Sequence, residues 1–285
     1  MLIPELPMLT VQGRVNRLWV RERSTHHLIV AMSGAGKTGL MTQCIMPLCA
    51  ADRLLFIDVK NGTDPMLAGI GREIGPRDLR MIYAGQGGGP TGTWFRLAVD
   101  PVGAHETARQ AVKTALELAL EIGDIVVAVD EARAVTETGQ GQLGLGQLYE
   151  SLLTRGRSNG VTCISAVAAT DNMRPAVRNQ WSFAWCGAVN SAEVIRAALG
   201  ILSLPNTQKI GSTPNPYWPV IRNLAEYQWL YLDNKGPTGN RTVMAKVRSW
   251  NPSALSISAQ FRAITHRKQR CITECEREFL RSARN

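Results

Sequence analysis

The stretch that decides the fold is His27-Leu28-Ile29-Val30-Ala31-Met32-Ser33-Gly34-Ala35-Gly36-Lys37-Thr38. A short apolar run, typical of a buried strand, leads into a loop of small residues, and residues 39–46 continue with a helix-like pattern. A strand, a glycine-containing loop, Gly-Lys-Thr and a helix form the context of a phosphate-binding P-loop. Small residues let the backbone approach a phosphate closely, and the loop N–H groups and the positive end of the helix face its oxygens.

The P-loop predicts a site for ATP and Mg²⁺. We expect Lys37 to reach the β- and γ-phosphates and the Thr38 hydroxyl to ligate Mg²⁺. The residues predicted to bind the nucleotide are Ser33, Gly34, Ala35, Gly36, Lys37, Thr38 and Gly39. Ala31 departs mildly from the G-x-x-x-x-G-K-[ST] pattern, because it replaces the first glycine with another small residue. An ordinary glycine turn before a helix is the alternative, and the apolar run with an intact Gly-Lys-Thr argues against it.

A second motif, Ile125-Val126-Val127-Ala128-Val129-Asp130-Glu131, follows roughly 90 residues after the P-loop. At the end of a buried strand, Asp130 is expected to hold Mg²⁺, and Glu131 to orient and polarise the attacking water. Any buried strand can end in an acidic pair, so the position of this pair after a P-loop carries the prediction. Two consecutive acids also favour hydrolysis over nucleotide binding alone.

Two arginines, Arg155 and Arg157, stand at the predicted end of a helix, just before a strand. An ATPase whose site lies at a subunit interface needs a cation to stabilise charge on the transferred phosphate. Either arginine is therefore a candidate catalytic finger for the site of a neighbouring subunit. Solvated or DNA-facing arginines are the alternative for each of them.

The rest of the chain alternates apolar runs with helical patterns. The apolar runs are 53–58, 79–84, 125–131, 161–167 and 183–189, and the helices are expected at 106–121, 147–155 and 192–199. Residues 85–92 and 139–146 are glycine-rich loops, 205–219 is a long loop, and 228–250 a hairpin. This order predicts an α/β fold with a mainly parallel central sheet flanked by helices.

Composition limits the class of protein. The chain has 285 residues, 45% hydrophobic and 19% charged, which is typical of a globular protein. It shows no membrane-length apolar run and no signal peptide, so we expect a soluble, cytoplasmic protein. The six cysteines lack C-x-x-C pairs and are expected to be reduced thiols rather than zinc ligands. A net charge of +9 favours a polyanionic partner.

These motifs, taken in order, resemble the FtsK–HerA superfamily of P-loop motor ATPases. Besides the two motifs above, Asp58-Val59-Lys60 resembles the family's Asp-Pro-Lys-Gly segment, and Phe95–Pro101 loosely resembles an Asn-Pro-Leu segment. Residues 155–166, beginning Arg-Gly-Arg-Ser-Asn-Gly, resemble the stretch that leads to the family's sensor glutamine. That glutamine falls at Ala168 and is missing, so coupling to the γ-phosphate would need another group, such as Thr170 or Asn172.

The resemblance implies a RecA-like motor domain over 26–250, a lead-in over 1–25 and a basic helical tail over 251–285. It implies a homo-oligomeric ring, a hexamer in the family, that moves double-stranded DNA through its channel in viral genome packaging or mobile-element transfer. A viral motor of this kind would be in the host cytoplasm or associated with the virion, with a capsid, portal or membrane partner. The glycine-rich 139–146 segment is then a candidate channel loop, and an unconstrained surface loop is the alternative. One alternative is an assembly or secretion ATPase resembling the zonula occludens toxin family, acting on protein. Another is a nucleotide-binding module with vestigial hydrolysis, suggested by Ala31 and Ala168.

Overall fold

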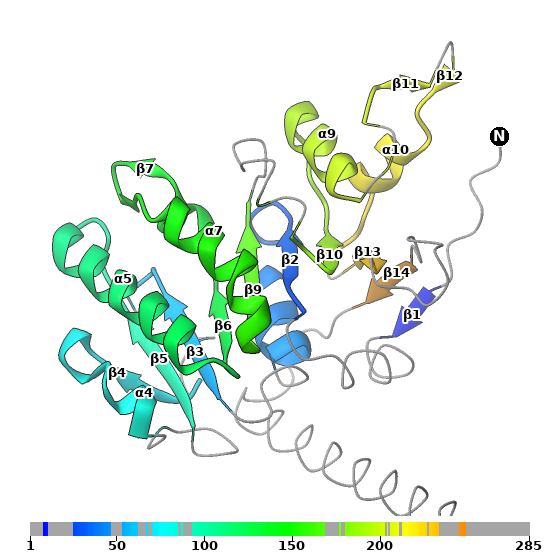
Figure 1. Ribbon diagram of the computed structural model, residues 1–285. Coiled ribbons are helices and arrows are strands. Elements are labelled where there is room, and N and C mark those ends of the chain that lie inside the picture. Colours follow the sequence, from blue (N-terminus) through cyan, green and yellow to red (C-terminus); the bar gives the residue numbers. More distant parts are fainter. Residues whose placement is uncertain are drawn as a thin grey trace, which may run out of the picture.

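The computed structural model describes residues 8–10, 25–46, 53–61, 67, 70–84, 87, 93–168, 177, 180–202, 204, 206–210, 213–226, 228–233 and 245–248. Most strands of this part belong to one sheet: β1 (Met8–Thr10), β2 (His27–Val30), β3 (Leu54–Asp58), β4 (Arg72–Ile74), β5 (Trp94–Ala98), β6 (Val126–Val129), β9 (Thr162–Val167), β10 (Phe183–Cys186), β13 (Gln228–Asp233) and β14 (Ala245–Arg248). Their spatial order is β1-β14-β13-β10-β2-β9-β6-β3-β5-β4 (Figure 1).

The central strands run parallel. From β10 to β4 every neighbouring pair in the sheet is parallel, whereas β13 is antiparallel to both β10 and β14. The pair β13–β14, with Gln228 opposite Arg248, confirms the predicted C-terminal hairpin strands; the turn residues 234–239 lie outside the described part of the chain. Within the lead-in, β1 pairs with β14 at the sheet edge.

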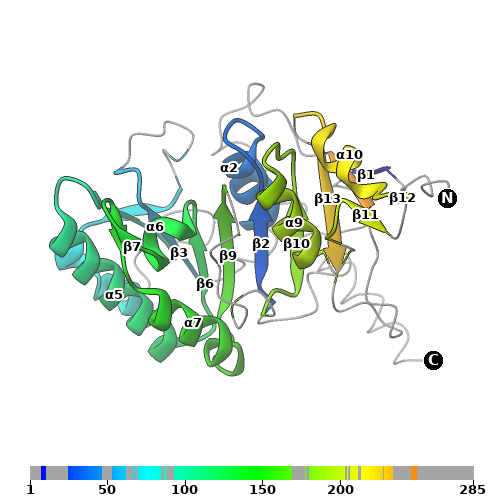
Figure 2. The same cartoon turned by 90° about the horizontal axis from the view of Figure 1, so that it is seen from above.

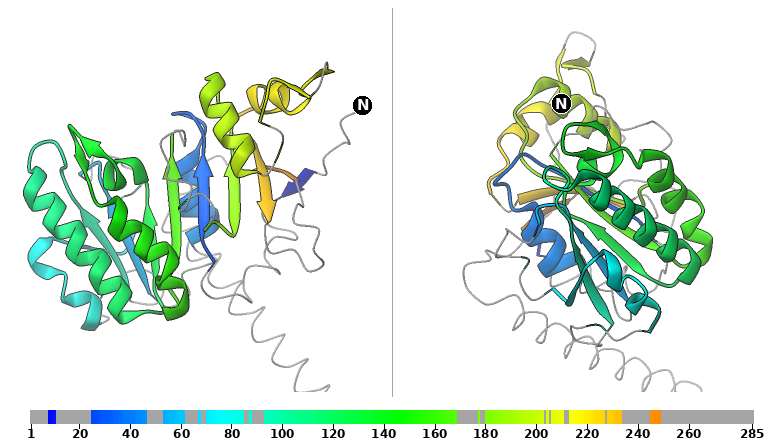
Figure 3. Two further views of the ribbon diagram at one scale, coloured as in Figure 1. Left: turned by 45° about the horizontal axis from the view of Figure 1, so that its top comes forward. Right: turned by 90° about the vertical axis from the view of Figure 1, so that its left-hand side faces the viewer.

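Helices cover both faces of the sheet. On one face lie α5 (His105–Ile122), α6 (Ala132–Thr136), α7 (Gly146–Thr154), α9 (Ala192–Ile201) and α10 (Tyr217–Arg222). On the other lies the P-loop helix, in which α2 (Lys37–Gly39) continues into the π-helical segment η1 (Leu40–Ile45) (Figure 2). The sheet is therefore the middle of three layers, as the left view of Figure 3 shows.

Because both faces are covered, the central strands are apolar along their whole length instead of alternating. In β2, Leu28 and Val30 pack in the larger core with α5 and α7, whereas Ile29 packs on the other face with Leu40 and Met41 of the P-loop helix. The unbroken apolar run before the P-loop thus reflects a strand buried on two sides.

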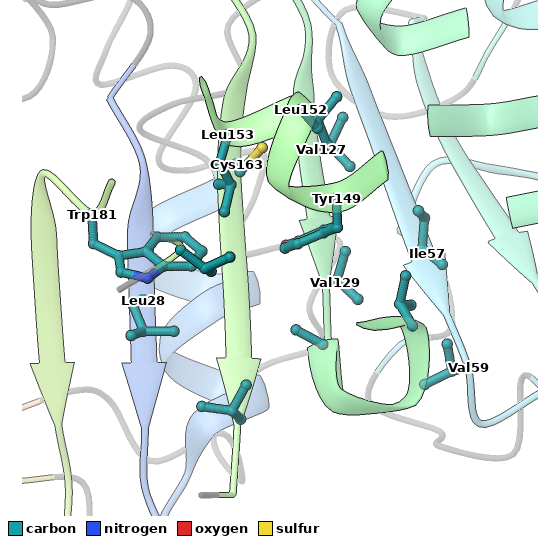
Figure 4. Packing of buried hydrophobic residues seen from close by; sticks show 14 of the residues in the cluster. Leu28, Ile57, Val59, Val127, Val129, Tyr149, Leu152, Leu153, Cys163 and Trp181 are labelled. Carbon is teal, nitrogen blue, oxygen red and sulfur yellow. The ribbon is translucent and has the colours of Figure 1, made fainter. Parts of the chain in front are cut away.

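The larger core is built where α7 lies across the strands. Tyr149, Leu152 and Leu153 of α7 point at β6 and β9, close to Val127 and Cys163 (Figure 4). The Tyr149 hydroxyl makes a very short hydrogen bond with that of Ser165 in β9, and both side chains are buried. Burial raises the pKa of Tyr149 well above its usual range, so the phenol stays protonated and acts as a structural link.

Several segments differ from the sequence-based expectations. Residues 79–84 form a turn and the helix α4 (Met81–Ala84) after the 3₁₀ turn η3 (Pro76–Asp78), and the edge strand β4 and its neighbour β5 were not predicted. The 139–146 segment is a small hairpin of β7 (Thr138–Gly139) and β8 (Gln142–Leu143), and the 205–219 loop contains the pair β11 (Lys209–Ile210) and β12 (Thr213–Pro214) and the start of α10. Except for β5, which buries Trp94, Phe95 and Leu97, these elements are short or mostly exposed, so they leave little hydrophobic periodicity.

The structure describes the side chains of two of the six cysteines. Cys163 and Cys186 are buried free thiols, and burial raises the pKa of Cys186 to about 12. No group of three or more His, Cys, Asp or Glu that could hold a metal occurs among the described residues. Nor does any described helix combine the length and apolarity needed to cross a membrane. The tail from 251 onward lies outside these residues.

Candidate functional site

The P-loop leaves the carboxyl end of β2 at the centre of the sheet. Gly34 and Gly36 have φ angles of 81° and 89°, in the left-handed region that favours glycine. The backbone N–H of Leu40 donates to the Gly36 carbonyl over 2.9 Å, which starts the P-loop helix directly after the loop. The loop is therefore folded as a P-loop requires, with its backbone free of bulky side chains at both glycines.

The alanine that replaces the first P-loop glycine is accommodated by a neighbouring strand. Ala31 is fully buried, and Gly187 lies beside it after the end of β10. A Cβ on Gly187 would lie 2.8 Å from the Ala31 methyl and 2.8 Å from the Trp229 ring. The methyl group of Ala31 thus occupies space that the missing side chain of Gly187 leaves open.

Lys37 lies against the loop that precedes it. Its Nζ donates to the carbonyl oxygens of Ala31 and Met32 over 2.9 and 3.1 Å. Burial lowers the pKa of the Lys37 ammonium, and the nearby carboxylates of Glu131 and Asp130 act in the opposite direction. The ammonium is held at the mouth of the loop, close to both acids of the second motif.

The fold brings the second motif to the P-loop. Strand β9 lies between β2 and β6, and all three are parallel, so their carboxyl ends meet at one edge of the sheet. Across that edge the Thr38 hydroxyl donates to Oδ1 of Asp130 over 3.0 Å, although the two residues are 92 positions apart. Thr38 and Asp130, each expected to ligate Mg²⁺, therefore lie in contact and offer two hard oxygen ligands side by side.

Glu131 follows directly, at the start of α6. Its Oε1 is buried and has no hydrogen-bond partner among the described residues. Burial raises the pKa of the Glu131 carboxyl, whereas the Lys37 ammonium opposes that shift. A buried carboxylate oxygen that the protein leaves unpartnered is costly for folding, and such groups are typical of sites that receive a ligand or water.

A second lysine belongs to this site and was not among the predicted site residues. Lys60, in the turn after β3, places its Nζ in very close ionic contact with Oδ2 of Asp130. That Oδ2 makes no hydrogen bond of good geometry within the described residues, so the contact is primarily ionic. In the sequence, the only sign that Lys60 belongs to the site is the Asp58-Val59-Lys60 segment, which resembles a family motif.

Ala168, the position that the resemblance assigns to the missing sensor glutamine, lies at the same edge of the sheet as the P-loop. Ala168 directly follows β9, between the carboxyl ends of β2 and β6, and it is half-buried. A methyl group cannot donate or accept a hydrogen bond there. The two residues suggested as substitutes, Thr170 and Asn172, lie outside the described residues.

Arg155 and Arg157 are not part of this cluster. Both are exposed, and they lie between α7 and β9, in and just before the 3₁₀ turn η4 (Gly156–Asn159). Because this turn precedes β9, it lies at the amino edge of the parallel strands, opposite the P-loop. The Asn159 side chain donates to the Leu120 carbonyl over 3.1 Å and attaches the turn to the end of α5.

A separate hollow of about 770 Å³ lies between η3–α4 and α5, lined by residues that include Arg77, Arg80, Tyr83, Glu106 and Gln110. None of the predicted site residues lines it. The hollow is thus separate from the cluster of Lys37, Thr38, Lys60, Asp130 and Glu131 at the P-loop.

Comparisons with known proteins identify the fold of the chain. No protein-family model matches the chain, and no curated protein matches its sequence. Among solved structures, the genome-packaging NTPase B204 from Sulfolobus turreted icosahedral virus 2, in complex with sulfate, aligns with a TM-score of 0.53 at 14% identity, covering 81% of this chain and 98% of that one. Its complex with AMPPCP aligns with a TM-score of 0.53 at 15% identity, covering 80% and 98%.

The pCW3 conjugation coupling protein TcpA, in its monomer form with ATPγS, aligns with a TM-score of 0.52 at 13% identity. That alignment covers 85% of this chain and 65% of TcpA. At these identities the likeness concerns the fold alone. The chain has the RecA-like P-loop NTPase fold that the sequence predicted.

Proposed function

We propose that this protein is an ATP-hydrolysing motor of the FtsK–HerA type that moves double-stranded DNA. The observation that carries the proposal is the cluster at the carboxyl edge of the sheet. There the Thr38 hydroxyl contacts Asp130 over 3.0 Å, and the charges of Lys37 and Glu131 act on each other. The motif order and the shared fold with a packaging NTPase and a conjugation coupling protein support it further.

The residues present fit a magnesium nucleotide. Gly34 and Gly36 leave the loop open to a phosphate, Lys37 supplies a positive charge beside it, and Ser33, Ala35 and Gly39 are the remaining small or polar residues of the predicted binding segment. Thr38 and Asp130 offer the hydroxyl and carboxylate oxygens that Mg²⁺ prefers. When bound, Mg²⁺ would neutralise charge on the phosphates.

Glu131 is the proposed general base. Its unpartnered Oε1 can accept a hydrogen bond from a water molecule and take its proton as the water attacks. The raised pKa of the carboxyl makes it a better proton acceptor than an exposed glutamate. The Lys37 ammonium, which opposes that rise, keeps Glu131 from becoming neutral too readily.

Arg155 and Arg157 are proposed to act on a neighbouring subunit. Their place at the amino edge, away from the P-loop of their own chain, suits a finger that reaches into another site. We accordingly propose a homo-oligomeric ring, a hexamer as in the resembling superfamily, with DNA in its channel. The β7–β8 hairpin is the candidate channel loop, and a capsid, portal or membrane partner would recruit the ring.

The direct test is ATP hydrolysis by the purified chain with and without duplex DNA. We expect DNA to stimulate hydrolysis, with the stimulation falling steeply as salt rises, because phosphate contacts release counterions. Glu131→Gln is the control for a contaminating ATPase. Hydrolysis that is indifferent to DNA would favour the protein-directed assembly ATPase instead. If Glu131→Gln left single-turnover hydrolysis unchanged, the chain would be a binding module.

A further inference from the structure

Lys60 is built into the magnesium side of the site. Its side chain is 42% exposed, while that of Asp130 is only 1% exposed, so the ammonium covers the buried carboxylate from the solvent side. The two oxygens of Asp130 therefore have different partners in the chain. Oδ1 accepts the Thr38 hydroxyl, and Oδ2 is ion-paired with Lys60.

The turn after β3 is shaped to deliver this lysine. β3 pairs with β6 in parallel, with Ile57 opposite Val129, so the residues that follow the two strands are neighbours. Asp58 is fully buried, and its Oδ1 accepts the backbone N–H of Lys60 over 2.9 Å. Asn61, with φ at 53°, then turns the chain away in the left-handed conformation. The hydrogen bond and the left-handed turn thus fix the backbone from which the Lys60 side chain projects.

The carboxylate of Asp130 already has a cationic partner without a metal. Lys60 is ion-paired with Asp130, and the Lys37 ammonium acts on Asp130 and Glu131 from the P-loop side. A divalent cation that approaches Asp130 without a nucleotide must displace the Lys60 ammonium, and both lysines repel it. A nucleotide triphosphate brings the negative charge that removes this penalty.

We propose that Lys60 is a positioning residue that competes with Mg²⁺ for Asp130, so that the metal binds firmly only together with the nucleotide. The inference rests on the proposed function, in which Thr38 and Asp130 hold Mg²⁺. The ion pair keeps the carboxylate oriented toward Thr38 and withholds it from free divalent cations. Binding of metal and nucleotide is thereby coupled, and by linkage each ligand raises the affinity for the other.

The experiment measures metal binding directly, by electron paramagnetic resonance of Mn²⁺ added to the purified full chain without nucleotide. The variants are Lys60→Met and Lys60→Gln, which remove the charge. The matched control is Lys113→Met, which removes a lysine from the surface ion pair with Glu117 (3.7 Å) on α5. Circular dichroism melts establish that each variant is folded.

We expect both Lys60 variants to bind Mn²⁺ about five-fold or more tightly than the wild type in the absence of nucleotide. With a fluorescent ATP analogue present, the affinities of wild type and variants for Mn²⁺ should converge. Lys113→Met should behave as the wild type. Unchanged or weaker Mn²⁺ binding in both Lys60 variants, or equal tightening in Lys113→Met, would overturn the inference.

Failure of the proposed function has a different signature. If the wild type does not bind the fluorescent ATP analogue, or if Lys37→Ala leaves that binding unchanged, the P-loop is not the nucleotide site. Wild-type binding that is lost in Lys37→Ala, with Mn²⁺ affinity unaffected by Lys60→Met and Lys60→Gln, overturns only the role of Lys60.

Discussion

The two edges of the parallel sheet are built in opposite ways. At the carboxyl edge, four charged residues crowd together (Lys37, Lys60, Asp130 and Glu131), and a buried oxygen of Glu131 has no partner among the described residues. At the amino edge, the fully buried His26 has both ring nitrogens engaged: Nε2 lies 2.8 Å from the Leu153 carbonyl, and Nδ1 accepts the Cys163 N–H over 3.0 Å. That pattern assigns the proton to Nε2 of a neutral imidazole.

This difference shows where the fold tolerates a loss of folding free energy. The His26 ring at the amino edge has both of its polar atoms partnered and contributes stability, whereas the carboxyl edge carries buried charge that lowers stability and can serve chemistry. If the comparison is right, substitutions at the carboxyl edge should reduce activity without loss of stability. Substitutions at the amino edge should do the reverse.

The largest effect is expected for Glu131→Gln. Loss of the general base should slow ATP hydrolysis by about 10²- to 10⁴-fold while ATP binding persists.

Because burial raises the folded pKa of Glu131, its ionised form destabilises the fold near neutral pH. The variant should therefore melt at a higher temperature than the wild type at pH 7. That advantage should vanish toward pH 4, where the glutamate is largely protonated in the unfolded chain as well. A lower melting temperature at pH 7 would contradict the contrast between the edges.

At the amino edge, His26→Ala should lower the free energy of unfolding by about 2–4 kcal/mol, because it leaves a cavity and strands the Leu153 carbonyl and Cys163 N–H. Urea unfolding measures this. His105→Ala is the matched control, since His105 is exposed and makes one hydrogen bond, to the Gln142 carbonyl; it should cost well under half as much. Single-turnover hydrolysis at each site, per folded His26→Ala molecule, should stay near the wild-type value, and a loss as large as that of Glu131→Gln would break the separation.

A smaller effect is expected from pH. Only ionised Glu131 can accept a proton, so kcat should fall about ten-fold per pH unit below the carboxyl pKa. Because burial raises that pKa, the decline should begin at a higher pH than for an exposed glutamate, whose pKa is about 4.3. A pH profile of single-turnover hydrolysis tests this over the range where circular dichroism shows the protein folded. A profile that stays flat down to about pH 4.3 would mean that Glu131 is not the base.

The smallest effect on stability should come from Arg155→Ala and Arg157→Ala. Both side chains are exposed, so each change should alter the free energy of unfolding by no more than about 0.5 kcal/mol. If one of them is a finger for a neighbour, that variant should lose hydrolysis in the assembled state. Mixing it with a Glu131→Gln variant should restore part of the activity, because some interfaces then combine an intact arginine with an intact Glu131. If neither variant loses hydrolysis, both residues are surface arginines without a catalytic role.

The sequence predicted the centre of this molecule better than its periphery. The strands β2, β6 and β9 are buried on both faces, so their apolar runs were unambiguous, and the P-loop and Asp130–Glu131 motifs mark their carboxyl ends. The parallel order then brings Thr38 and Asp130 together. By contrast, β4 has only three residues, two of them exposed and charged, and could not be told from a loop.

Lys60 shows a different limit of sequence reasoning. Its residue type is common on surfaces, and nothing in the spacing places it opposite Asp130. Only the register of β3 against β6, together with the buried Asp58 that holds the turn, brings its ammonium to the carboxylate. Ala31 is similar, because its tolerance depends on Gly187, a residue far along the chain.

His26 would have a mechanical role in the proposed oligomer. The residue directly precedes β2, the strand that carries the P-loop, and its imidazole is hydrogen-bonded to Leu153 at the end of α7, two residues before Arg155. A force applied by a neighbouring subunit at Arg155 or Arg157 would pass through that bond into the P-loop strand over a short, stiff path. Strain at one nucleotide site would thereby be felt at the next, without any long flexible segment in between.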